Sequence, residues 1–175
     1  MTAPAIALDE FLTKATDADW AAMRKAAPAH LLDQHDAAAT EALNATMTEM
    51  ALFHGAKEIT WARHRDVPEW IRLSVLDTVT RFFAGRADTC MHQPSADHPE
   101  PVLAAAWRPG LVTCTDCAHL FRLAGDADRR CDRCGRVCAG LPGDGIHSCR
   151  LMFGPLIYSY GLDRACMTEH TEATS

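Results

Sequence analysis

Two Cys-x-x-Cys pairs lie close together in the second half of the chain, and they constrain the fold more than any other feature. Their thiols are Cys114, Cys117, Cys131 and Cys134, with 13 residues between the pairs. Zinc takes four such ligands in a tetrahedron, and each Cys-x-x-Cys turn supplies two from one tight loop. The spacing therefore predicts that one zinc ion binds all four cysteines and ties the two loops together.

The remaining cysteines suggest a second site. Cys90 and His92 have the spacing of a ligand pair, and Asp163 and Cys166 have the spacing of a Cys-x-x-Cys turn with an aspartate in place of one thiol. We expect these two pairs to meet in a second zinc site, because an aspartate oxygen can also bind zinc. Alternative ligands for that site remain open, and they are Cys138, His147 and Cys149.

The compartment expected for the chain supports metal binding over disulfides. The N-terminal residues, MTAPAIALDEF, lack the basic segment and long apolar core of a secretion signal. We therefore expect a cytoplasmic protein with reduced thiols. The longest apolar run, LMFGPLIYSYGL at 151–162, is interrupted by Gly154 and Pro155 and is too short to cross a bilayer, so no membrane association is expected.

The first half of the chain has the patterning of helices. Thr16 and Asp19 predict the start of a short helix that ends before Pro28. A second helix is predicted to end near Gly55, and a third, with Asp66 and Glu69 in capping-box spacing, near Gly85. The core stripe expected on the second helix is Leu32, Ala39, Leu43, Met47 and Met50, and the arc expected on the third is Ile71, Val75, Val79, Phe82 and Phe83.

The composition of the sequence changes at Cys90, which is the first of the eight cysteines of the chain. We therefore predict an α+β protein in which a small N-terminal helical bundle, residues 1–89, precedes a cysteine-rich zinc-ribbon module, residues 90–166, and a disordered tail, residues 167–175. Within the module, VLAAAWRPG is expected to form a short helix ended by Pro109. The stretches GLVTC and HLFRL alternate as short strands do.

Residues 110–138 resemble the zinc-ribbon superfamily, on the strength of CTDC, CDRCG and the flanking strand-like stretches. The resemblance implies two knuckles on one ion, with Gly135 at positive φ; Ala118 stands where the first knuckle often has glycine. The motifs CMH, AAWRPG, CTDC, CDRCGRV and YGLDRAC are also similar to a group of uncharacterised actinobacterial proteins with paired Cys/His ligands. That pattern has cysteine where Asp163 stands, and it implies no activity.

The predicted function is binding, because four thiolates leave a zinc ion no open position for substrate. The net charge of −6 has no basic half, since residues 1–89 carry 9 Lys and Arg against 13 Asp and Glu and residues 90–175 carry 8 against 10. A regulatory adaptor with a protein partner is therefore favoured over a nucleic-acid binder. Four arginines near the second knuckle offer either a phosphate-binding patch or an offset to the charge of the site, and they are Arg129, Arg130, Arg133 and Arg136.

Two further alternatives concern the metal and the chemistry. Iron in a rubredoxin-like site is the rival to zinc, but the Glu-x-x-His pairs of rubrerythrin helices are absent from the sequence of residues 1–89. A metalloenzyme of hydrolase or deaminase type would need an open second zinc site. Zinc deaminases combine a histidine ligand, a glutamate that transfers protons and a Cys-x-x-Cys pair. His98, Glu100 and the first pair match this pattern poorly, because Pro99 and Pro101 obstruct the helix that should carry the glutamate and only 13 residues separate Glu100 from Cys114.

Overall fold

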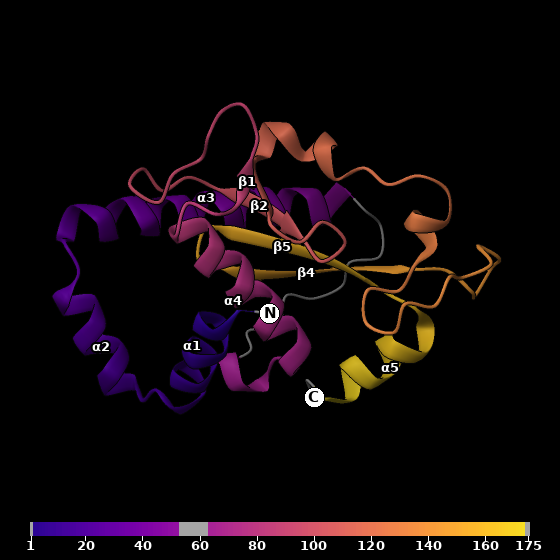
Figure 1. Cartoon of the computed structure of the whole chain (residues 1–175), viewed down its shortest axis with the longest axis horizontal. Helices are drawn as coiled ribbons and strands as arrows, with labels where there is room; N and C mark the ends of the chain where they lie inside the picture. Colours follow the sequence, from indigo (N-terminus) through magenta and orange to yellow (C-terminus); the bar gives the residue numbers. More distant parts are fainter. Residues whose placement is uncertain (1, 53–62, 174–175) are drawn as a thin grey trace.

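The structure is a computed structural model of the chain, and the residues it describes are 2–52 and 63–173. These two ranges contain helices and a mixed sheet, so the predicted α+β class is confirmed (Figure 1). The α-helices are α1 (Ala3–Lys14), α2 (Asp17–Ala26), α3 (Ala29–Leu52), α4 (Glu69–Phe83) and α5 (Arg164–Ala173). The 3-10 helices are η1 (His64–Asp66), η2 (Thr115–Phe121) and η3 (Gly125–Arg129).

The sheet has five strands within the described residues, in the order β1-β3-β2-β5-β4. The strands are β1 (Asp88–Thr89), β2 (Val102–Ala105), β3 (Leu111–Cys114), β4 (His147–Phe153) and β5 (Leu156–Leu162). β1 runs parallel to β3 and β2 runs parallel to β5, whereas the β2–β3 and β4–β5 pairs are antiparallel. The apolar run at 151–162 forms most of the β4–β5 hairpin, with its turn at Gly154 and Pro155.

The short N-terminal helices follow their local signals closely. Thr16 caps α2 by accepting a hydrogen bond from the Asp19 N–H, and the Asp19 side chain accepts one from the Thr16 N–H in return. This capping box and the stop before Pro28 confirm the predicted helix. The helix α1 was not predicted from the sequence, although a proline in its first turn is a common start signal.

The helix α3 is present as predicted, but it buries a different stripe. Among residues 29–49, whose side chains the structure describes, the buried ones are Ala38, Ala42 and Thr46, four residues apart, while Met47 is 49% exposed. The expectation that Met47 belongs to the core is therefore wrong, because the small residues one position earlier allow closer packing. The side chain of Met50, also expected in the core, lies outside the described part. The predicted stop at Gly55 lies outside the described residues.

The helix α4 forms the link between the helices and the sheet. Its buried face includes Ile71 and Val75, which share one core with Val112 of β3, Tyr158 of β5 and Cys131. The capping box expected from Asp66 and Glu69 is not formed: Asp66 ends η1, and the residue before α4 makes no side-chain cap. Phe83, expected in the core, is 70% exposed at the last residue of the helix.

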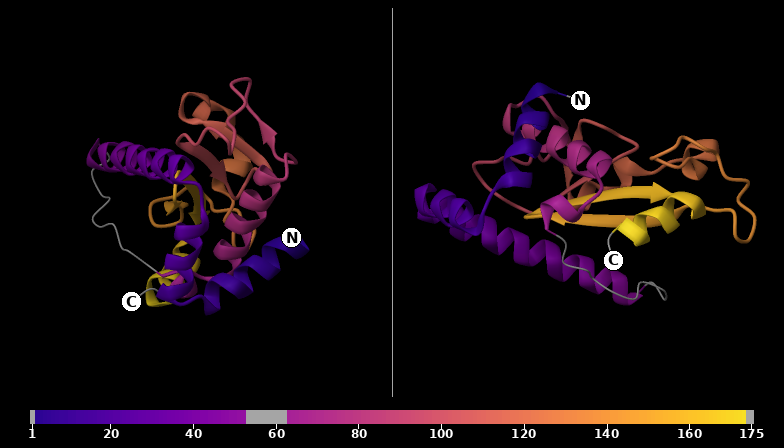
Figure 2. Two further views of the ribbon diagram at one scale, coloured as in Figure 1. Left: turned by 90° about the vertical axis from the view of Figure 1, so that its left-hand side faces the viewer. Right: turned by 90° about the horizontal axis from the view of Figure 1, so that it is seen from below.

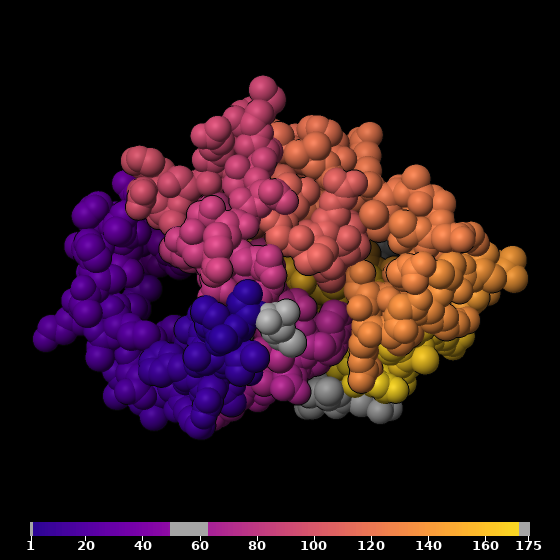
Figure 3. Space-filling model, in the orientation of Figure 1, coloured from indigo at the N-terminus to yellow at the C-terminus, as the bar shows by residue number. Residues whose placement is uncertain are grey.

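Helices cover both sides of the β4–β5 hairpin. Figure 2 shows α3 along one side and α4 with α1 on the other. Glu49 of α3 forms an ion pair with Arg150 of β4, and α1 packs against α4. Figure 3 shows an opening in the surface between the N-terminal helices and the rest of the molecule, beside α2, which has no buried residue. No helix of residues 2–52 and 63–173 combines the length and the apolar character needed to span a membrane.

Three further local predictions need correction. VLAAAWRPG does not form a helix: its first four residues are the buried strand β2, because a short apolar run suits either structure and the sheet decides between them. HLFRL is not a strand, since its first three residues belong to η2. The tail expected to be disordered from residue 167 is helical as far as Ala173, because α5 is anchored at its first turn.

Candidate metal centres

The eight predicted ligands come together in two groups of four, and in each group the ligand atoms all lie within 4.8 Å of one another. Cluster A consists of Cys90, His92, Cys114 and Cys117; cluster B consists of Cys131, Cys134, Asp163 and Cys166. The prediction that one ion binds both Cys-x-x-Cys pairs is therefore wrong. The first Cys-x-x-Cys pair instead meets Cys90 and His92, and the second pair meets Asp163 and Cys166.

The sheet positions cluster A. The parallel register places Asp88 beside Leu111 and Thr89 beside Val112, so the chain leaves β1 at Cys90 where β3 ends at Cys114. A tight turn then brings His92 back toward Cys114, with the Gln93 N–H donating to the Cys90 carbonyl at 2.9 Å. Gln93 has a φ of 50°, an uncommon value for a residue with a side chain.

The other two thiols of cluster A stand at the last residue of β3 and in the first turn of η2. This turn carries Cys117 beyond Cys114, and Ala118 follows Cys117 without a left-handed backbone. This 3-10 geometry explains why glycine is not needed after the first pair. The Trp107 indole N–H donates to the Phe121 carbonyl at 2.9 Å and so fixes the end of η2.

The distances within cluster A fit a single tetrahedral ion. Around zinc with bonds of about 2.3 Å to sulfur, two sulfur ligands lie about 3.8 Å apart and a sulfur and a nitrogen about 3.5 Å apart. The Cys90 and Cys114 sulfurs are 3.8 Å apart, and the His92 Nδ1 lies 3.2 Å from the Cys114 sulfur and 3.4 Å from the Cys117 sulfur. A disulfide would need sulfurs about 2 Å apart.

Cluster B forms where a knuckle of the chain contacts the end of β5. The Gly135 N–H donates to the Cys131 carbonyl at 2.9 Å, and Gly135 has the positive φ, 77°, that the knuckle pattern predicted. The Asp132 N–H donates to the Gly161 carbonyl at 2.9 Å, and the Gly161 N–H donates to Asp132 Oδ2 at 2.6 Å. These reciprocal bonds attach the knuckle to the last residues of β5.

Asp163 links cluster B to the helix α5. Its Oδ1 accepts a hydrogen bond from the Cys166 N–H at 2.8 Å, which is the bond an N-cap side chain makes with the first turn of a helix. Its Oδ2 lies 3.3 Å from the Cys134 sulfur, close to the separation of two ligands on one ion. One carboxylate therefore caps α5 with one oxygen and faces the three thiols with the other.

Backbone N–H groups are directed at sulfurs in both clusters. Burial by itself would raise the pKa of Cys90, but N–H groups of Cys114 and His92 donate to its sulfur, and the pKa falls to about 7. At Cys131 burial again acts to raise the pKa, and N–H groups including those of Cys134 and Arg133 outweigh it. Such N–H to sulfur bonds stabilise thiolates, which are the form that binds metal.

The four arginines near cluster B are all engaged within the chain. Arg129 pairs with Asp126, Arg133 with Glu169 and Arg136 with Asp144, while Arg130 donates to the Gly135 carbonyl. The Nη1 atom of Arg136 lies 3.7 Å from Asp163 Oδ2. This arrangement favours the interpretation that the arginines offset the negative charge of the site over the interpretation of a phosphate-binding patch.

The alternative ligands and the deaminase residues lie outside both clusters. Cys138 is buried, and its N–H donates to the Arg129 carbonyl. The Cys149 sulfur lies 3.7 Å from the Met167 sulfur, and burial raises the pKa of this thiol to about 11. His98 and Glu100 are exposed. Within the described part of the chain, Cys114 and Cys117 therefore lie beside Cys90 and His92, and not beside the His98 and Glu100 that the deaminase alternative requires.

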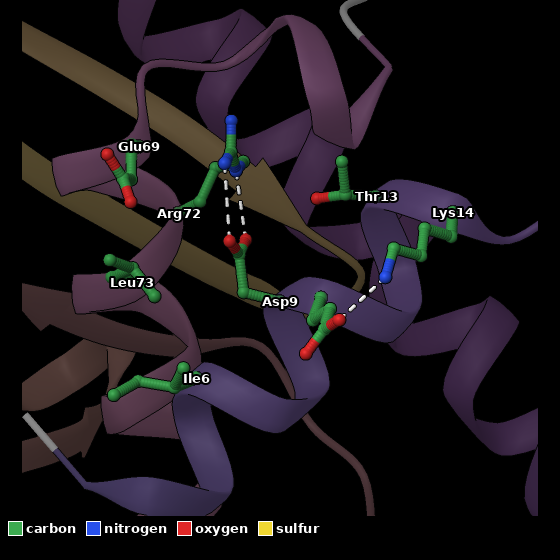
Figure 4. A pocket seen from close by; sticks show the side chains of 8 residues that line it. Ile6, Asp9, Thr13, Lys14, Glu69, Arg72 and Leu73 are labelled. Carbon is green, nitrogen blue, oxygen red and sulfur yellow. Dashed lines mark hydrogen bonds and ion pairs between the residues drawn. The ribbon is translucent and has the colours of Figure 1, made fainter.

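A separate hollow lies between α1 and α4, and Figure 4 shows the side chains that line it. Arg72 forms two hydrogen bonds with Asp9, at 2.9 and 3.2 Å, and His64 contacts the same carboxylate at 2.8 Å. Lys14 pairs with Glu10 at the rim. These charges satisfy one another and connect α1 with η1 and α4.

Comparison of the chain with models of protein families, with curated proteins and with solved structures gave no match. The resemblance to zinc ribbons thus rests on cysteine spacing, and the local structure departs from it. A ribbon places both knuckles on one ion, whereas here the two Cys-x-x-Cys pairs belong to two clusters that contain different ligands. The structure shows two cysteine-rich clusters that could each hold a metal ion.

Proposed function

We propose that the protein binds two zinc ions, one in each cluster, and that it acts as a regulatory adaptor for a protein partner. The observation that carries the proposal is the convergence of eight ligand side chains from four separate parts of the chain into two compact groups. Thiolates, imidazole and carboxylate at tetrahedral spacing are the ligands that zinc prefers.

The donor sets support zinc over the iron alternatives. A rubredoxin-like iron site needs four cysteines, and each cluster has three, completed by His92 in cluster A and by Asp163 in cluster B. An iron–sulfur cluster is also disfavoured, because its cysteines bind different iron atoms and lie further apart than ligands of one ion. The ligand atoms here all lie within 4.8 Å.

The ligand count supports a structural role for both ions. Four protein ligands fill a zinc tetrahedron and leave no position for water or substrate. A cluster A ion would connect the loop after β1 to η2, and a cluster B ion would connect the knuckle at 131–134 to the first turn of α5. The protein would then present a rigid surface for binding, and its acidic balance supports a protein partner over nucleic acid.

Metal analysis of the purified, reduced chain tests the proposal. We expect two zinc ions per chain, and one in each of the variants Cys90→Ser and Cys134→Ser. A matched control is Cys138→Ser, which removes a buried thiol outside the clusters and should retain both ions. A folded chain that contains no zinc and is indifferent to chelators would overturn the proposal.

Two further measurements separate the adaptor from its alternatives. The metalloenzyme alternative predicts nuclease or deaminase activity that disappears in Cys134→Ser, and we expect no such activity. The nucleic-acid alternative predicts salt-dependent binding that is lost when Arg129, Arg130 and Arg133 are changed. We expect weak binding that does not depend on these arginines, because each already has an acceptor within the chain.

A further inference from the structure

The two clusters differ in the ligand that faces solvent. In cluster A the exposed ligand is His92, and the three thiols are buried, with Cys90 4%, Cys114 9% and Cys117 5% exposed. In cluster B the exposed ligand is a thiol, Cys134, while Cys131, Asp163 and Cys166 are buried. A reagent in solution therefore meets an imidazole at cluster A and a sulfur at cluster B.

This difference matters for oxidation, because a thiolate reacts with peroxides and an imidazole is inert under the same mild conditions. With zinc bound, three thiolates and a carboxylate give cluster B a formal charge of about −2, against about −1 for three thiolates and an imidazole in cluster A. The sulfurs of cluster B are therefore the more electron-rich, and one of them, that of Cys134, is exposed.

We propose that Cys134 is a site of oxidation by peroxides, at which a disulfide with Cys131 forms and the zinc of cluster B is released while cluster A keeps its ion. The proposal rests on the zinc binding proposed above. Cys131 is the expected partner because it lies in the same knuckle, so that the bridge forms with little movement of the backbone.

The chemistry balances with hydrogen peroxide as the oxidant. The Cys134 thiolate attacks one peroxide oxygen, the S–O bond forms and the O–O bond breaks, and the departing hydroxide takes a proton to become water. The Cys131 thiolate then attacks the sulfenic sulfur, the S–S bond forms and the S–O bond breaks, and a second water leaves. Two thiolates, one peroxide and two protons thus give one disulfide and two waters.

Loss of the ion would act on α5. Asp163 and Cys166, the two ligands that would lose the ion without entering the disulfide, stand at the start of this helix. Arg133 of the knuckle pairs with Glu169 at the surface, and Met167 contacts the half-buried Cys149. His170 of α5 also contacts the buried Tyr160 of β5 at 3.2 Å. Oxidation of the knuckle therefore removes the metal connection of α5 to the knuckle and leaves the helix held by the contacts of Glu169, Met167 and His170.

The cysteines outside the clusters are poor competitors for the oxidant. Burial raises the pKa of Cys149 to about 11, so that this side chain is a neutral thiol at neutral pH. Cys138 is 1% exposed. Reaction at either residue would also release no zinc, because neither belongs to a cluster.

Zinc release from the full, zinc-loaded chain under limiting hydrogen peroxide tests the proposal, with a chromogenic zinc chelator as the readout. We expect one of the two zinc ions to leave in a fast phase. Differential alkylation and peptide mass spectrometry should then identify the bridge between Cys131 and Cys134. Proteolysis within α5 should become faster at the same stage.

Exchanging the exposed ligands provides matched variants. Cys134→His places an imidazole at the exposed position of cluster B, so it should keep two zinc ions and lose the fast phase. His92→Cys places a thiol at the exposed position of cluster A, so both ions should leave in the fast phase. If Cys134→His fails to hold its second zinc, mass spectrometry of the unaltered chain still decides the site of first oxidation.

The results that would overturn this proposal differ from those that would overturn zinc binding. Fewer than two zinc ions before oxidation would contradict the proposed function itself. Two ions before oxidation, followed by a fast phase that is unchanged in Cys134→His, or by a first disulfide within cluster A, would contradict only the role of Cys134. A first bridge between Cys134 and Cys166 would overturn the release of α5, because it would hold the helix to the knuckle.

Discussion

The sulfur atoms of Cys90 and Cys114 lie 3.8 Å apart, although Cys114 comes 24 positions after Cys90 in the chain. The parallel pairing of β1 with β3 brings them together, yet β1 has only two residues, both exposed. So short an edge strand has little stability of its own. We infer that the ligands and the strand depend on each other, since the strand aligns the thiols and a bound ion would hold the strand in place.

Double substitutions test which thiols share an ion. Cys90→Ser with Cys114→Ser removes two ligands of cluster A, so we expect one zinc per chain. Cys114→Ser with Cys131→Ser removes one ligand from each cluster, so we expect both ions to be lost. In the ribbon arrangement Cys114 and Cys131 would bind the same ion. The variant with Cys114→Ser and Cys131→Ser would then lose only that ion and keep the other. Zinc analysis after gel filtration distinguishes the two arrangements.

The two roles of Asp163 can be separated by substitution. Asp163→Asn keeps an oxygen that can cap α5 but removes the charge that binds zinc, so we expect zinc affinity at cluster B to fall by roughly tenfold or more. Asp163→Cys supplies a fourth thiolate but no cap, so zinc should bind more tightly while zinc-free α5 loses about 1 kcal/mol. Competition with a chelator of known affinity measures the first effect, and an unchanged affinity in Asp163→Asn would exclude this residue as a ligand.

The sequence predicts which residues are ligands better than it predicts which ligands share a site. Cysteine, histidine and aspartate at ligand spacing are local features, and all eight candidates lie in the two clusters. Which pair meets which depends on long-range contacts, the parallel register of β1 with β3 and the bond between Asp132 and Gly161. Nothing in the cysteine spacing encodes these contacts, so the nearest two pairs were matched wrongly.

The same division between local and distant information explains the fold predictions. The helix from Asp17 to Ala26 was predicted correctly because Thr16, Asp19 and Pro28 fix its ends locally. The strand β2 was predicted as part of a helix, because VLAA becomes a strand only through its pairing with β3 and β5. The exposure of Met47 likewise depends on where α3 contacts the hairpin and not on its periodicity alone.

The carboxylate of Asp9 stabilises the junction of α1, η1 and α4. The side chains of Asp9, His64 and Arg72 are 12%, 14% and 14% exposed, so Asp9→Ala would leave the Arg72 guanidinium largely buried without its carboxylate. We expect the free energy of unfolding to fall by about 3 kcal/mol, measured by urea denaturation of the zinc-loaded chain. Glu10→Ala is the control, because the exposed pair of Glu10 with Lys14 should contribute nothing measurable.

The same contact predicts how acid acts on stability. The hydrogen bond from Arg72 is the largest influence on the pKa of Asp9, and with the contact of His64 it outweighs burial and lowers the pKa. A carboxyl group whose pKa is lower when folded stabilises the protein above its unfolded pKa of about 3.9 and loses this contribution as the pH falls through the folded value. The difference in unfolding free energy between the unaltered chain and Asp9→Ala should therefore be constant above about pH 5 and shrink below about pH 4.

Only the difference between these two proteins is informative at low pH, because acid also protonates zinc ligands and weakens both proteins alike. Urea denaturation at each pH, with zinc content recorded in parallel, gives this difference. A gap in stability that stays the same from neutral pH to pH 3 would contradict a lowered pKa for Asp9.

Gly154 permits the turn of the β4–β5 hairpin to lie against α3. Its φ is 58°, and a Cβ at this position would lie 2.7 Å from the Nε2 of His35. The exposed ring of His35 can swing away, so the lasting cost of Gly154→Ala is backbone strain, about 1–2 kcal/mol. Gly145→Ala is the matched control, since Gly145 has no positive φ and no heavy atom would lie within 4 Å of its Cβ. Adding His35→Ala to Gly154→Ala should recover little of the lost stability, and a recovery of most of it in denaturation experiments would show that the contact with α3 matters more than the strain.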